Sequence, residues 1–172
     1  MNYALLIAGG SGNRMGQEIP KQFIHVDDCP IIVHTMKAFE RHPDIEAIAV
    51  VCLEGWETVL RSYANQFSIT KLRWIFKGGE TGMESIHNGI YGLKAEGCND
   101  DDLILVHDGV RPMVSTAVVE RCFGVARQAK AVIPVTPVVE TLRQVMPDGT
   151  SQTVNRDAYR LVQTPQTFDL QL

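Results

Sequence analysis

The sequence lacks the features that mark several large classes of protein. Its four cysteines are widely spaced and none forms a C-x-x-C pair, so neither a zinc site nor a redox pair is indicated. No stretch approaches the roughly 18 apolar residues of a membrane span. The first apolar run is too short for a signal peptide and has no basic lead-in. We therefore expect a cytoplasmic protein with no membrane partner.

An excess of positive charge is also absent. The chain has 16 Lys and Arg against 20 Asp and Glu, which gives a formal net charge of −4. A mildly acidic protein does not attract nucleic acid by its overall field, so we expect no nucleic-acid partner. Any anionic ligand must be held by local cations and backbone N–H groups. The 172 residues, 45% of them hydrophobic, predict one globular domain with a substantial core.

A glycine-rich segment at residues 8–23 is the most informative stretch of the chain. It follows a short apolar run and reads AGGSGNRMGQEIPKQF. Glycines let the backbone turn tightly and aim its N–H groups at a ligand. The segment also carries two cations, Arg14 and Lys21. N–H donors and fixed positive charge suit a polyphosphate, so the segment predicts an enzyme that handles a nucleoside triphosphate. The alternative is a glycine turn with a purely structural role.

Two familiar phosphate-binding motifs do not fit this segment. Gly10, Gly12 and Gly16 are spaced G-x-G-x-x-x-G, one residue longer than the Rossmann fingerprint. The next expected strand, residues 45–53, comes too late to supply the acidic residue of that motif. A Walker A loop is excluded because no glycine pair is followed by Lys-Ser or Lys-Thr. The segment therefore belongs to neither motif.

Apolar runs alternate with longer amphipathic stretches along most of the chain. This alternation predicts an α/β fold with a mostly parallel sheet and helices on both faces. The expected strands are residues 3–7, 45–53, 72–76, 103–107 and 131–135. The expected helices are residues 30–41, 56–66, 83–96 and 116–128. Thr81 and Glu84 form a capping box at the start of the third helix.

The pattern changes in the last quarter of the sequence. Two short extended segments, 138–145 and 152–156, flank the turn sequence Pro-Asp-Gly-Thr at residues 147–150. They predict a β-hairpin that either protrudes as an arm, pairing with another subunit, or folds over an edge of the sheet. The final residues, 168–172, resemble the start of an interrupted helix. We expect a single domain over residues 1–172.

Three unusual segments each follow a different expected strand. The glycine-rich loop follows the first strand, Gly78–Thr81 follows the third, and His107–Pro112 follows the fourth. The carboxyl ends of parallel strands lie at one edge of a sheet, where ligands bind. We therefore expect the three segments to line one cleft, although they are far apart in the sequence.

The candidate catalytic and metal-binding residues lie in two of these segments. Asp108 at a strand end suits Mg²⁺, which favours one or two carboxylates plus phosphate oxygens. Its alternative role is a turn or N-cap aspartate. Arg14 and Lys21 are the candidate catalytic cations, because preorganised positive charge stabilises a phosphorus centre that gains negative charge during transfer. Their alternative role is that of surface cations.

Three further side chains are candidates for substrate contacts. Ser85, one turn into the third helix, either donates to a base or ribose or is an ordinary helix-surface serine. Arg111 and Arg156 suit a second anionic substrate, because the planar guanidinium fork matches a phosphate. Surface salt bridges are their alternative role. His107 is expected to pack at the end of its strand.

Five segments, in the same order and at similar intervals, resemble the 2-C-methyl-D-erythritol 4-phosphate cytidylyltransferase family. The closely related ribitol-5-phosphate cytidylyltransferases look much the same. The segments read AGGSGNRMG…PKQF (8–23), GGETGMESI (78–86), VHDGVRP (106–112), VVETL (138–142) and VNR…QTPQTF (154–168). The resemblance covers essentially the whole chain and implies a Rossmann-like nucleotidyltransferase fold.

The resemblance also implies a reaction, in which CTP and a polyol phosphate give a CDP-polyol and pyrophosphate with Mg²⁺. Methylerythritol phosphate is the expected acceptor, and ribitol 5-phosphate is the alternative. Arg14 and Lys21 match the family's transition-state stabilisers, and Asp108 matches the acidic residue near the metal and the polyol phosphate. The residues in the CTP-binding part are Ala8, Gly9, Gly10, Gly12, Gly79, Glu80 and Ser85. The residues that match second-substrate contacts are Arg111, Thr141 and Arg156.

The 138–156 hairpin resembles the family's dimer arm, which implies a homodimer whose active sites each receive residues from the neighbouring subunit. Three segments depart from the usual pattern of the family: Gly82 replaces Arg, Gly109-Val110 replaces Ala-Ala, and Glu140 replaces Asp. Members of the family also continue past the position of Leu172, into a segment with another substrate-positioning lysine. We expect this C-terminal part of the family's domain to be absent from the sequence. These departures leave a nucleotide-binding module without turnover as the alternative to an enzyme.

Overall fold

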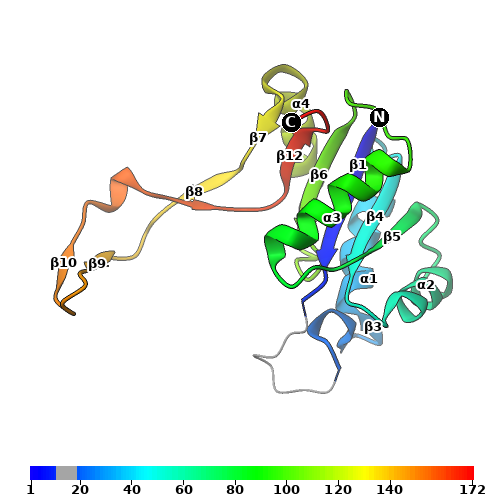
Figure 1. The fold of residues 1–172 in the computed structure, drawn as a ribbon, viewed down its shortest axis with the longest axis horizontal. Coiled ribbons are helices and arrows are strands. Elements are labelled where there is room, and N and C mark those ends of the chain that lie inside the picture. Colours follow the sequence, from blue (N-terminus) through cyan, green and yellow to red (C-terminus); the bar gives the residue numbers. More distant parts are fainter. Residues whose placement is uncertain (11–18) are drawn as a thin grey trace.

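The computed structural model describes residues 1–10 and 19–172, and a six-stranded sheet forms its centre (Figure 1). The order of the strands across the sheet is β5-β4-β1-β6-β12-β7. Their bounds are β1 Asn2–Ala8, β4 Ala47–Cys52, β5 Leu72–Lys77, β6 Leu103–Asp108, β7 Ala131–Val132 and β12 Gln166–Asp169. Strands β5, β4, β1 and β6 are parallel, and β12 is antiparallel to both of its neighbours. The predicted α/β fold with a mostly parallel sheet is confirmed.

Helices cover both faces of the sheet, as the continuous apolar strands predicted. The helices are α1 Ile31–Glu40, α2 Glu57–Gln66, α3 Gly82–Ala95 and α4 Thr116–Ala129. Side chains of α1, α2 and α4 share one core with alternate residues of the central strands, such as Leu6. The intervening residues, such as Leu5, pack on the opposite face, which α3 covers. No helix in the described part of the chain is long and apolar enough to cross a membrane.

A compact connection leads from the glycine-rich segment to α1. It consists of a short 3-10 helix, η2 Lys21–Phe23, and a small β-hairpin. The strands of this hairpin, β2 His25–Val26 and β3 Cys29–Pro30, have two residues each. The Phe23 ring is buried and stacks on Trp56, with 4.6 Å between ring centroids. This contact fixes η2 against the body of the protein just before α2 begins.

A long arm leaves the sheet after β7 and returns at β12 (Figure 1). Its base pairs β8 Val135–Pro137 with β11 Arg160–Val162, and its tip pairs β9 Arg143–Val145 with β10 Ser151–Thr153. A second 3-10 helix, η3 Arg156–Ala158, lies between tip and base. The turn predicted at residues 147–150 joins β9 to β10, and the expected hairpin does protrude as an arm. The arm is longer than the predicted range of 138–156 because β8 and β11 extend its base.

Two of the expected elements near the end of the chain are wrong. The strand expected at 131–135 stops at Val132 in the sheet, because the chain turns away at Pro134, which has no N–H for a continued ladder. The helix start expected at 168–172 is instead the end of β12, where Phe168 pairs with Ile104 of β6. Pairing between segments about sixty residues apart overrides the local pattern there.

Candidate active site

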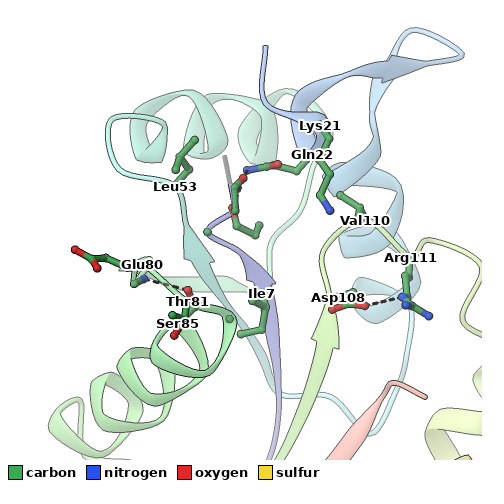
Figure 2. Close-up of a pocket in the computed structure, with 15 residues that line it drawn as sticks. Ile7, Lys21, Gln22, Leu53, Glu80, Thr81, Ser85, Asp108, Val110 and Arg111 are labelled. Carbon is green, nitrogen blue, oxygen red and sulfur yellow. Dashed lines mark hydrogen bonds and ion pairs between the residues drawn. The ribbon is translucent and has the colours of Figure 1, made fainter. Parts of the chain in front are cut away.

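A cleft of about 560 Å³ lies at the carboxyl ends of β1, β5 and β6 (Figure 2). Its size falls within the range of small-molecule binding sites. Gly9 and Gly10 come from the loop after β1, residues 79–81 from the loop after β5, and Asp108 and Arg111 from the end of β6 and the turn that follows it. The described parts of the three segments that were expected to converge thus do line one cleft.

The loops after β1 and β5 are joined by direct contact of two glycine backbones. The Gly78 N–H donates to the Cys52 carbonyl at 2.8 Å, which carries the chain over the end of β4 toward β1. A Cβ atom on Gly78 would lie 2.9 Å from the Cα of Gly9 and 3.1 Å from the Cys52 carbonyl oxygen. Only a residue without a side chain permits this approach of two backbones.

The N-terminus of α3 forms one side of the cleft. The Thr81 hydroxyl accepts the Glu84 N–H at 3.1 Å, which confirms Thr81 as the N-cap. In a capping box the Glu84 carboxylate would accept the N–H of the N-cap residue itself. Here it accepts the N–H of Glu80 instead, one residue before the N-cap, at 2.8 Å. Ser85 is buried and its hydroxyl accepts the Gly79 N–H at 3.0 Å, so it is not an ordinary surface serine. A serine oxygen that accepts one bond can still donate its own hydrogen to a ligand.

Lys21 reaches the cleft from η2 and is followed in the chain by two buried side chains. Gln22 donates from its Nε2 to the Ala8 carbonyl at 2.8 Å and to the Gly10 carbonyl at 3.1 Å. Phe23, the next residue along η2, is held by its stack on Trp56. Figure 2 shows Lys21 and Gln22 on one side of the cleft and the Asp108 side chain on another. The fold therefore fixes the backbone of an exposed lysine next to the start of the glycine loop.

The turn after β6 presents an ion pair to the cleft. The Arg111 Nε lies 2.5 Å from the Asp108 carboxylate, and both side chains are partly exposed. Beneath them, the buried His107 ring bonds through Nε2 to the Arg111 carbonyl at 2.9 Å. Burial lowers the pKa of His107 below its ordinary value, although the Arg111 carbonyl and the Asp108 charge oppose the shift. His107 packs at the strand end, as expected.

The chemistry of this turn suits a magnesium ion. In residues 1–10 and 19–172, no three His, Cys, Asp or Glu side chains form a group that could hold a metal by themselves. Mg²⁺ keeps several waters and binds through one or two carboxylates plus phosphate oxygens. A single carboxylate, Asp108, at the wall of an open cleft fits that requirement.

The structure divides the predicted site residues into three sets. Those that line the cleft are Ala8, Gly9, Gly10, Lys21, Gly79, Glu80, Ser85, Asp108 and Arg111. Thr141 and Arg156 lie in the arm, where Arg156 donates to the Val139 carbonyl. Gly12 and Arg14 lie outside the described residues. Six further residues line the cleft that the sequence did not indicate: Ile7, Gln22, Leu53, Thr81, Gly82 and Val110. All but Leu53 and Gly82 are adjacent in sequence to predicted site residues, and adjacency was the available signal.

A family model described as IspD, 2-C-methyl-D-erythritol 4-phosphate cytidylyltransferase, matches residues 3–172. The chain belongs to this family. It is therefore a cytidylyltransferase, which is a nucleotidyltransferase enzyme, and the predicted enzyme class is confirmed.

Relatives in the IspD family carry two different substrate names. A 2-C-methyl-D-erythritol 4-phosphate cytidylyltransferase of Bacteroides thetaiotaomicron is 40% identical over 168 residues, which cover 98% of this chain and 74% of the relative. A ribitol-5-phosphate cytidylyltransferase of Lacticaseibacillus paracasei is 37% identical over 169 residues, or 96% of this chain and 70% of the relative. The solved structure of the Francisella tularensis 2-C-methyl-D-erythritol 4-phosphate cytidylyltransferase matches with a TM-score of 0.79 and 28% identity, covering 99% of this chain and 73% of that one.

Proposed function

We propose that this cytidylyltransferase transfers CMP from CTP to 2-C-methyl-D-erythritol 4-phosphate and releases pyrophosphate, a step in the formation of isoprenoid precursors. The observation that carries the proposal is the cleft itself, which joins a glycine loop, a lysine and an Asp–Arg pair at the carboxyl edge of the sheet. The family description and the 40% identical relative both carry the name of this acceptor.

CTP is expected to lie across the loops after β1 and β5. Backbone N–H groups at Gly9 and Gly10 suit its anionic phosphates, since glycine turns present such donors without side-chain obstruction. Residues of the α3 side, from Gly79 and Glu80 to Ser85, are placed for contacts with the cytidine. Ala8 completes the set of proposed CTP contacts at the end of β1.

The transfer itself is an in-line displacement at the α-phosphorus of CTP. A phosphate oxygen of the polyol phosphate forms the new P–O bond, and the bond from the α-phosphorus to the bridging oxygen breaks, so pyrophosphate leaves with the electron pair. Lys21, together with Arg14, stabilises the negative charge that accumulates at the phosphorus centre. Asp108 would hold Mg²⁺, which when bound neutralises phosphate charge. Arg111 is proposed to bind the phosphate of the acceptor.

The arm is proposed to complete the site across a homodimer. It leaves apolar side chains exposed along its length, including Val139 at 68%, Val145 at 71% and Val162 at 60% exposure, which a partner surface would cover. A second copy that covers these side chains would bring Thr141 and Arg156 to the neighbour's acceptor site. Each chain contributes a single nucleotidyltransferase domain over residues 1–172.

Ribitol 5-phosphate is the second candidate acceptor, favoured by the 37% identical ribitol-5-phosphate cytidylyltransferase. Pyrophosphate release from CTP should be measured with each polyol phosphate in turn, and the two values of kcat/KM compared. We expect a higher value for methylerythritol phosphate. A higher value for ribitol phosphate would support the second candidate, and release with neither acceptor would contradict both.

A further inference from the structure

Two buried side chains hold the turn that carries Asp108 and Arg111. The Thr35 hydroxyl, in the middle of α1, donates to the Gly109 carbonyl at 2.9 Å. The His107 ring donates from Nε2 to the Arg111 carbonyl at 2.9 Å. Thr35 is 0% exposed and His107 is 2% exposed. Both carbonyls of a surface turn are therefore held from inside the protein.

The Thr35 hydroxyl does not need the Gly109 carbonyl as its hydrogen-bond acceptor. Its hydroxyl also lies 3.3 Å from the Ile31 carbonyl of its own helix, a local partner available to any threonine in a helix. The shorter bond, from Thr35 to Gly109, satisfies the buried Gly109 carbonyl of the turn. A buried carbonyl that loses its hydrogen-bond donor destabilises the structure around it. The turn also lies directly on α1, since a Cβ atom on Gly109 would come within 2.7 Å of Ile32 Cδ1.

We propose that Thr35 and His107 are positioning residues for the acceptor half of the site, which binds a phosphorylated polyol and a divalent cation. They fix the shape of the 108–111 turn, and thereby keep the Asp108 carboxylate and the Arg111 guanidinium facing the cleft. This inference rests on the proposed function. The part of the site proposed to bind CTP is built from the loops after β1 and β5. Loss of either buried bond should therefore weaken binding of the acceptor and leave binding of CTP unchanged.

The first test compares Thr35→Val with Thr35→Ser. Valine keeps the shape but removes the hydroxyl, so KM for the polyol phosphate should rise about tenfold, the effect of roughly one lost hydrogen bond. The affinity for CTP, measured by calorimetry, should stay within about twofold of wild type. Serine keeps the donor and should restore the polyol KM. Thr167→Val is the matched control, because Thr167 is buried in β12 outside the residues that line the cleft.

The second test compares His107→Leu with His107→Gln, since the glutamine amide can place a donor near the position of Nε2. His107→Leu should raise the KM for the polyol phosphate and shift the Mg²⁺ titration of activity to higher concentrations. His107→Gln should return both quantities most of the way to their wild-type values. An unchanged polyol KM in both Thr35→Val and His107→Leu would overturn the inference. A parallel loss of CTP affinity would also overturn it, because that result indicates general damage to the fold.

A readout without turnover separates this inference from the proposed function. Amide hydrogen exchange at residues 109–111 should be faster in Thr35→Val than in wild type, while exchange at residues 79–85 is unchanged. Unchanged exchange at 109–111 overturns the positioning role. Wild-type protein that releases no pyrophosphate with any polyol phosphate overturns the proposed function, whatever the exchange experiment shows.

Discussion

The backbones of Gly9 and Gly78 lie so close together that a Cβ atom on either residue would come within 3.0 Å of the other's Cα. Gly9 follows β1, and Gly78 follows β5, the strand that leads into α3. Strand β4 lies between them in the sheet, and the Gly78 N–H bonds to the Cys52 carbonyl at the end of β4. This contact sets the distance between the glycine loop and the helix that together form the proposed CTP site.

Replacement of Gly78 by alanine should therefore weaken CTP binding. The added methyl group would collide with backbone atoms of Gly9 and Cys52, which cannot rotate away. We expect the loops to separate, with a calorimetric Kd for CTP at least tenfold higher and a loss of stability of about 1–3 kcal/mol. Gly124→Ala is the control, since a Cβ atom at that position in α4 meets nothing within 4 Å. Wild-type CTP affinity in Gly78→Ala would show that the contact is not needed.

Lys21→Ala should lower kcat by about 10²-fold or more, because it removes a cation that we propose stabilises the charge of the transition state. Its folding should change little, since Lys21 is exposed and the buried anchors Gln22 and Phe23 remain. Stopped-flow measurement of pyrophosphate release and a thermal unfolding curve provide the two readouts. Lys94→Ala, an exposed lysine at the end of α3, is the control. Near-normal turnover in the first variant would remove Lys21 from the catalytic residues.

Asp108→Asn should shift the Mg²⁺ titration of activity to higher concentrations. An amide is a weaker ligand than a carboxylate for a hard cation, and Arg111 would also lose its charged partner. Asp101→Asn, in an exposed turn, should leave the titration unchanged. A chelator such as EDTA should abolish pyrophosphate release by wild type. A Mg²⁺ titration in Asp108→Asn that matches wild type would count against a metal at this carboxylate.

A mixing experiment tests whether the arm acts on the neighbouring subunit. Lys21→Ala and Arg156→Ala should each be nearly inactive as pure dimers. After both are unfolded, mixed in equal amounts and refolded together, about a quarter of wild-type activity should return, because half of the dimers are mixed and each has one intact site. Recovery should be absent if Arg156 serves the cleft of its own chain.

The acid sensitivity of the fold should include a contribution from Glu40. Partial burial alone would raise the pKa of this carboxyl, but hydrogen bonds from Thr70 at 2.5 Å and from the Lys71 N–H at 2.9 Å outweigh it and lower the pKa. A depressed carboxyl pKa contributes stability above the unfolded value, about 4.3, and loses it as pH falls through the folded value. Unfolding curves should show Glu40→Gln as less stable at pH 7 and less sensitive to acid than wild type. Equal pH dependence would exclude this contribution.

The sequence predicted the elements whose signals are local. Strands β1, β4 and β6 are mostly apolar runs, β5 is apolar apart from Arg73 and Lys77, and Thr81 is a recognisable N-cap. Strand β12 was missed because it has four residues and depends on antiparallel pairing with β6, far away in the chain. At the site, the loops could be predicted from glycines and charges. The buried bonds of Gln22 and Thr35 could not, since they connect side chains to carbonyls that only the folded chain brings together.

The most direct test is a titration of the protein with CTP, followed residue by residue through backbone amide chemical shifts. We expect the largest shifts at residues 9–10, 21–22 and 79–85, with smaller ones at 108–111 that grow when Mg²⁺ and the polyol phosphate are added. Shifts concentrated elsewhere, for example around the opposite end of the sheet near Asn2 and Arg127, would contradict a shared nucleotide cleft at these loops.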